Sequence, residues 1–130
     1  MHTTRTVVLT ILTICLVIGG AVHVLDIVRG GVFPYRFAPL PVNVYWTSLA
    51  VLDLLAAFLL WRRRRFGLTL TVAIMLSDVA VNSYVTYGLN LAASFAPLQL
   101  QTLFLGFVFG SIGFLWPLDE PFPALAARRP

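Results

Sequence analysis

Residues 47–81, TSLAVLDLLAAFLLWRRRRFGLTLTVAIMLSDVAV, place four consecutive arginines between two long apolar stretches. About 20 apolar residues are needed for a helix to cross the roughly 30 Å hydrocarbon core of a bilayer. Because a chain in lipid must satisfy its own backbone hydrogen bonds, each apolar stretch is predicted to be a transmembrane helix. The arginine run then marks a turn at the membrane surface.

Outward from this stretch, the same pattern occurs four times in the 130-residue chain. The composition agrees, since 59% of the residues are hydrophobic and 11% are charged, against roughly 25% charged in soluble domains. We therefore predict an all-α membrane protein, a four-transmembrane-helix antiparallel bundle over residues 1–117, followed by a short cytoplasmic tail, 118–130. The expected spans are about 6–28, 43–61, 66–88 and 97–116.

The distribution of arginine predicts the orientation of the chain. All nine basic residues are arginine; four of them form the run at 62–65, whereas the loop at 89–96 carries no charge. By the positive-inside rule, the arginine turn and both termini are cytoplasmic and the uncharged loop is outside. Arg29 and Arg36, in the first outer loop, go against this trend. We expect a multi-pass protein of a bacterial-type inner (plasma) membrane, with no nucleic-acid partner, because the arginines act as topology signals and no nucleic-acid motif accompanies them.

The first apolar stretch has a second interpretation. Arg5, the apolar residues after it and the small residues at 19–21 resemble a signal peptide with a cleavage site. The apolar stretch continues to Val28, which favours a retained span, and cleavage would leave three spans in the same orientation. The single Cys15 provides neither a disulfide nor a cysteine-based metal site within one chain.

Two carboxylates lie where lipid tails are expected. Asp53 is about 15 Å into its span from the outer side, and Asp78 is about 18 Å into its span from the inner side, at 1.5 Å per residue. A carboxylate at the centre of a span costs about 2.5 to 3.5 kcal/mol, so it normally faces the bundle interior and indicates function. Because a short turn joins these two spans, we expect the acids to approach each other near the bilayer midplane.

Such a pair points to proton chemistry. Two carboxylates in a low dielectric cannot both ionise cheaply, so we expect one of them to hold a proton. Asp53 and Asp78 are therefore the candidate catalytic residues, as a general acid and base or as a proton-coupled binding site. The alternative is that each is protonated and only hydrogen-bonds a neighbouring helix.

Other polar side chains are the candidate ligand-binding residues. His23 and Asp26 share a helix face, and Asp26 has Arg29 within reach as an ion-pair partner. Asn82 lies one turn above Asp78, and at most one of the two glutamines near the start of the last span faces the bundle interior. Most of these groups lie in the outer half, which predicts a pocket that opens outward and is closed toward the cytoplasm. A metal site of one histidine with these acids is a weak possibility, and no metal or cofactor is expected. The candidate set is His23, Asp26, Trp46, Asn82, Gln99 and Gln101.

The sequence leaves three functions open, and with them the question of whether the chain is an enzyme. In the first, the bundle binds a membrane lipid or lipophilic small molecule and performs proton-transfer chemistry, as an isomerase or cyclase does. In the second, it is a small proton-coupled transporter. In the third, it is a non-catalytic accessory or structural subunit. The glycines of the last span form a small-xxx-small pattern that suits either packing within the bundle or a homodimer: Gly106, Gly110 and Gly113.

Overall fold

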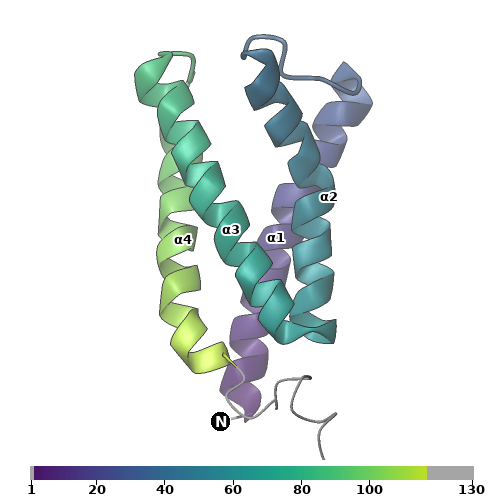
Figure 1. Cartoon of the computed structure of the whole chain (residues 1–130), viewed down its shortest axis with the longest axis vertical. Coiled ribbons are helices and arrows are strands. Elements are labelled where there is room, and N and C mark those ends of the chain that lie inside the picture. The colour runs from purple at the N-terminus through teal and green to yellow at the C-terminus, as the bar shows by residue number, and fades with distance from the viewer. Residues whose placement is uncertain (1, 117–130) are drawn as a thin grey trace, which may run out of the picture.

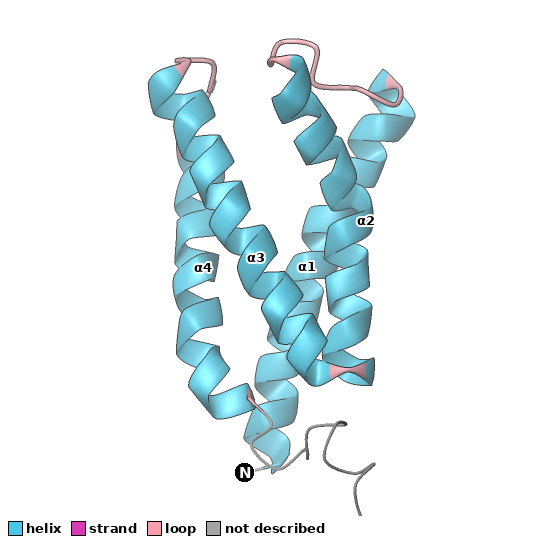
Figure 2. Cartoon of the chain, viewed as in Figure 1, coloured by secondary structure: helices cyan, strands magenta, loops and turns pink. Residues whose placement is uncertain are grey.

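The computed structural model describes residues 2–116, and this part of the chain is helical without any strand. The predicted tail, 118–130, lies outside the described residues. Figures 1 and 2 show successive helices running in opposite directions, with the N-terminus, the arginine turn and the end of the last helix at one end of the molecule. The helices are α1 (His2–Gly30), α2 (Leu40–Arg62), α3 (Arg64–Ser83), continued by the π-helix η1 (Tyr84–Gly88), and α4 (Ala96–Leu115).

Four helices are long and apolar enough to cross a membrane, which is the arrangement of a multi-pass membrane protein. The predicted all-α class and the number of helices are confirmed for the described residues. The spans are a few residues longer at most ends than expected: Thr3–Gly30, Leu40–Arg62, Arg64–Gly88 and Ala96–Leu115. α1 contributes three buried leucines to the core: Leu9, Leu12 and Leu16.

The turn between α2 and α3 is a single residue, Arg63, and it depends on a glycine. A Cβ atom at Gly67 would lie on the backbone nitrogen of Leu60 and 2.6 Å from the Leu59 carbonyl carbon. The two helix backbones therefore touch directly at this end. The arginine run is divided between the last turn of α2, the turn residue and the first turn of α3.

Successive helices pack against each other: α1 on α2, α2 on α3 and α3 on α4. In contrast, α1 and α4 make little contact with each other. Figure 1 shows the α3–α4 pair leaning away from the α1–α2 pair toward the end that carries the two longer loops. The core is therefore densest near the arginine turn, where it contains Leu9, Leu12, Leu60, Leu68 and Leu115.

The last turn of the third span is not an α-helix. From Tyr84 to Gly88 the chain forms a π-helix, and the amide of Leu91 then bonds to the carbonyl oxygen of Val85 at 3.1 Å. A π-turn widens the helix and frequently lies near a functional site. Here it buries Val85 and Thr86 two turns above Asp78.

Candidate functional site

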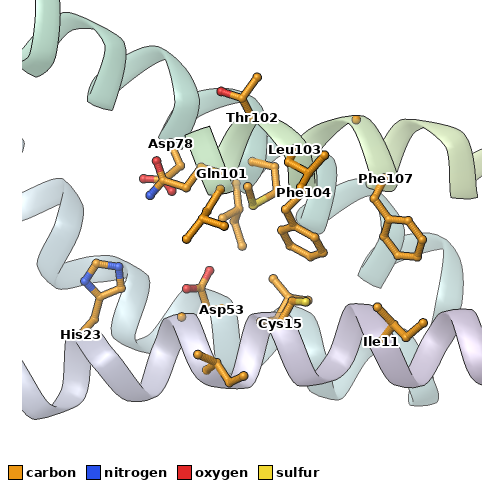
Figure 3. Close-up of a pocket in the computed structure, with 17 residues that line it drawn as sticks. Ile11, Cys15, His23, Asp53, Asp78, Gln101, Thr102, Leu103, Phe104 and Phe107 are labelled. Atoms are coloured by element: carbon orange, nitrogen blue, oxygen red, sulfur yellow. The ribbon is translucent and has the colours of Figure 1, made fainter. Parts of the chain in front are cut away.

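A cavity of about 1210 Å³ lies between α1 and α4. It takes six lining residues from α1 and seven from α4, while α2 and α3 form its back wall (Figure 3). The described lining residues are Ile11, Cys15, Leu16, Ile18, Gly19, His23, Asp53, Ile74, Met75, Asp78, Leu100, Gln101, Thr102, Leu103, Phe104, Gly106 and Phe107.

The mouth of this cavity is on the flank of the bundle. Three of its lining residues are largely exposed: Ile18 (59%), Leu100 (67%) and Leu103 (74%). They come from α1 and α4, the two helices that make little contact with each other. On a helix that spans a bilayer, such exposed apolar residues face lipid, so the mouth lies where lipid tails would be.

The two buried carboxylates line this one cavity. Asp53 of α2 and Asp78 of α3 are 6% and 7% exposed. Figure 3 shows Asp53 on the same side of the cavity as His23, with Asp78 and Gln101 on the opposite side. Polar groups thus gather at the end of the cavity nearer the long loops, and its other end is apolar, with Ile11, Cys15 and Phe107 among its residues.

The two carboxylates differ in their hydrogen bonds. The Asn82 amide donates to Oδ1 of Asp78 at 2.8 Å and to the Asp78 backbone carbonyl at 2.9 Å. Within residues 2–116, by contrast, the Asp53 carboxylate has no hydrogen-bond partner. Instead it packs against Gly19 of α1, where a Cβ atom would be 2.9 Å from Asp53 Oδ2. The missing side chain at Gly19 therefore makes room for the Asp53 carboxylate.

A loop tyrosine completes a hydrogen-bonded chain at the polar end. The hydroxyl of Tyr35 donates to Asp26 Oδ2 at 2.9 Å and lies 2.6 Å from Nδ1 of His23. Because its proton is directed to Asp26, the hydroxyl accepts a hydrogen bond from Nδ1–H of His23. This arrangement leaves Nε2 of the neutral imidazole as the free acceptor.

Tyr35 is held in place from several sides. Its backbone amide donates to Asn43 Oδ1 at 3.2 Å, and its ring contacts the rings of Trp46 and Phe37 edge to face. Burial, and then the hydrogen bond to Asp26, raise the pKa of Tyr35 well above its ordinary value. The phenol thus remains a donor at any physiological pH. This role could not be predicted from the sequence, because the contact depends on how the loop at 31–39 returns to the bundle.

The structure divides the predicted ligand-binding residues into three groups. His23 and Gln101 line the large cavity, whereas Trp46 and Asn82 line a smaller one of about 370 Å³ beside the loop between η1 and α4. Asp26 and Gln99 line neither cavity. Asp26 bonds to Tyr35 and not to Arg29, and Gln99 is exposed. As expected, only one of the two glutamines faces the interior.

The cavity extends further toward the arginine turn than the positions of the polar residues predicted. It passes the level of Asp53 and reaches Ile11 and Phe107. Within the described residues, no group of three His, Cys, Asp or Glu side chains is close enough to hold a metal ion.

The glycine pattern of α4 does not pack against another helix within residues 2–116. A Cβ atom at Gly106, Gly110 or Gly113 would meet nothing within 4 Å. Gly106 borders the cavity, and all three glycines are exposed. Of the two uses expected for this pattern, packing within the bundle is not seen in residues 2–116, and the homodimer stays a prediction.

Comparisons of the chain with protein-family models, with curated proteins and with solved structures find no match.

Proposed function

We propose that this chain binds a lipophilic small molecule from the bilayer and moves a proton to or from it through Asp53 and Asp78. The chemistry is of the kind used by isomerases and cyclases. The orientation proposed from the arginines, in a bacterial-type inner membrane, brings the polar end of the cavity toward the outer side.

One observation carries this proposal: a cavity of about 1210 Å³ that is apolar except at one end, where two buried carboxylates face it. Ligand pockets are mostly apolar, with a few polar groups that fix orientation. The mouth on the flank, rimmed by exposed apolar residues, suits a molecule that arrives through the membrane.

The two acids support proton transfer because their surroundings differ. Asp78 accepts a hydrogen bond from the Asn82 amide. Asp53 instead packs against Gly19 and Gly20 of α1 and has no such donor within residues 2–116. Two carboxyl groups in one cavity but in different environments are suited to act as acid and base in a single reaction.

The inner half of the bundle favours binding over transport. A transporter needs a path from the cavity to the cytoplasmic side. On that side Leu12, Leu68 and Val108 have 0% exposure and Leu115 has 1%, so the described helices close tightly there. We therefore place the proton-coupled transporter second.

The test is to identify what the protein retains and then to measure its conversion. Full-length protein extracted with its native lipids should carry a lipophilic compound that mass spectrometry detects. We expect Asp53→Asn and Asp78→Asn each to lower turnover of that compound by about 10²- to 10⁴-fold, the usual contribution of a general acid or base. Unfolding curves of both variants should show that they remain folded.

Ser77→Ala is the matched control. Ser77 precedes Asp78 on α3 but bonds to Tyr45 at 2.8 Å and lies outside the cavity. The turnover of the Ser77→Ala variant should stay within about twofold of that of the unmodified protein. Unchanged turnover in both aspartate variants would remove proton transfer from the proposal. If Asp53→Leu combined with Asp78→Leu raised stability and kept every bound compound, the structural-subunit alternative would replace it.

A further inference from the structure

The charge of the cavity lining is one-sided. Its polar end is lined by the carboxylates of Asp53 and Asp78, with the Gln101 amide beside them. Asp53 is 6% exposed and has no hydrogen-bond partner within residues 2–116, and Oε1 of Gln101 has none there either. A buried acceptor without a partner is costly, so these atoms call for a donor that this part of the chain does not supply.

No positive side chain balances the two acids. Among the described lining residues there is no arginine, and the chain has no lysine. The described arginines lie at the ends of the helices and in the first loop. His23 is the one lining side chain that can become positive, and its Nδ1 is engaged with Tyr35. A buried carboxylate without a counter-ion is strongly disfavoured, so the missing partner has to be a cation or a proton.

We propose that the cavity binds a lipophilic amine in its protonated form, with the ammonium group between Asp53, Asp78 and Gln101 and the apolar body toward Ile11 and Phe107. An ammonium group is a compact cation with up to three N–H donors, which matches the unpartnered oxygens in both charge and hydrogen bonding. A phosphate, sulfonate or carboxylate head would meet two acids and no arginine. The inference rests on the proposed function, whose ligand class it names.

The apolar part of the cavity accommodates the body of such a molecule. The whole cavity, of about 1210 Å³, is larger than the roughly 300–1,000 Å³ typical of pockets that bind drug-sized ligands. Aromatic rings of Phe104 and Phe107 from α4 line it opposite Cys15 and Ile11 of α1. A single alkyl chain or a fused-ring body would fit beside these residues, and the flank mouth would leave room for a longer tail.

The only cysteine of the chain provides a site-specific readout. Cys15 lines the apolar half of the cavity, so a bound tail should shield it from a lipid-soluble maleimide. The full-length protein is placed in nanodiscs, and the rate of Cys15 modification is followed by intact-protein mass. The probes are dodecylamine, 1-dodecanol and dodecanesulfonate at equal ratios to lipid, since a common chain cancels the apolar contribution.

We expect dodecylamine to slow modification at least tenfold more than either of the other probes. Asp53→Asn should remove most of this preference and Gln101→Leu should weaken it, while Ser77→Ala should leave it unchanged. Should Asp53→Asn not fold, Asp78→Asn takes its place. A rise in unfolding temperature that is specific to dodecylamine provides an independent measurement in case Cys15 reacts too slowly.

The outcomes separate this inference from the proposed function. Equal or better protection by dodecanol or dodecanesulfonate would overturn the amine assignment but would keep a lipophile-binding cavity. Protection by none of the three, together with no shift in unfolding temperature, would count against both. A preference for dodecylamine that survives Asp53→Asn and Asp78→Asn would place the ammonium site elsewhere.

Discussion

Tyr35 links the first loop to the cavity through one hydroxyl group. Its bonds to Asp26 and His23 fix the imidazole so that Nδ1 is occupied. A hydrogen bond to a charged group contributes roughly 1.5–3 kcal/mol, and leaving a buried partner unsatisfied costs about as much. Tyr35 is therefore a positioning residue for His23 and a stabilising contact for the loop.

Tyr35→Phe should keep the ring contacts and lose both bonds. We expect the free energy of unfolding in detergent to fall by about 2–3 kcal/mol. Tyr84→Phe is the control, because Tyr84 is 56% exposed and its hydroxyl has no partner within residues 2–116. Equal losses in the two variants would contradict the assigned role of the Tyr35 hydroxyl.

The same residue predicts a response to alkaline pH. Burial and the Asp26 hydrogen bond raise the pKa of Tyr35 above the value of about 10 expected in the unfolded chain. A raised pKa stabilises the fold fully below pH of about 10, and this stability is lost as the pH rises further. The alkaline loss should therefore be smaller in Tyr35→Phe than in the parent.

At the scale of single residues, the sequence predicted the burial of the two carboxylates better than it predicted the other polar residues of the site. Asp53 and Asp78 are buried in one cavity because exposure of either to lipid is costly, and that cost can be read from their positions alone. Which of the two glutamines, Gln99 or Gln101, lines the cavity depends on the rotation of α4 about its axis. Tyr35 depends on a loop path that no local rule specifies.

At the level of the helices, two glycines have opposite surroundings. Gly67 has no room for a methyl group, because the backbone of α2 lies against it, whereas Gly110 faces open space. Gly67→Ala should force α2 and α3 apart and lower stability by about 2 kcal/mol or more. Gly110→Ala should leave stability unchanged or raise it by up to about 1 kcal/mol.

Unfolding by denaturant in mixed micelles measures both variants. A small effect at Gly67 would mean that the arginine turn tolerates a wider helix crossing than the structure has. A large loss at Gly110 would instead indicate a neighbour that residues 2–116 do not supply, such as the second copy predicted for the glycine pattern.

The sequence predicted the number and approximate ends of the helices but not how they pack. In a soluble helix, polar and apolar faces distinguish the surface from the core. Here Leu12 is fully buried, and Ile11 and Ile14, which are chemically similar, are 41% and 52% exposed. Without that contrast, the lean of the α3–α4 pair and the flank mouth could not be predicted.

At the level of the whole molecule, charge and cavity are arranged along one axis. The N-terminal end of α1, the arginine turn and the end of α4 lie together, and Arg5 lies over the ring of Phe114 at 5.8 Å. The cavity has its polar end toward the opposite pole, near the two longer loops. Orientation in the membrane therefore decides which compartment the polar end of the cavity faces.

We expect the arginine pole to face the cytoplasm, because arginine-rich short loops are retained on that side. Cysteines introduced in a Cys15→Ser background measure this. Ser94→Cys, in the exposed loop between η1 and α4, should react with a membrane-impermeant maleimide in intact cells. Thr3→Cys, exposed at the other pole, should react only after permeabilisation. The reverse pattern would mean that the polar end of the cavity exchanges protons with the cytoplasm, and the chemistry proposed for the two acids would then draw on cytoplasmic protons.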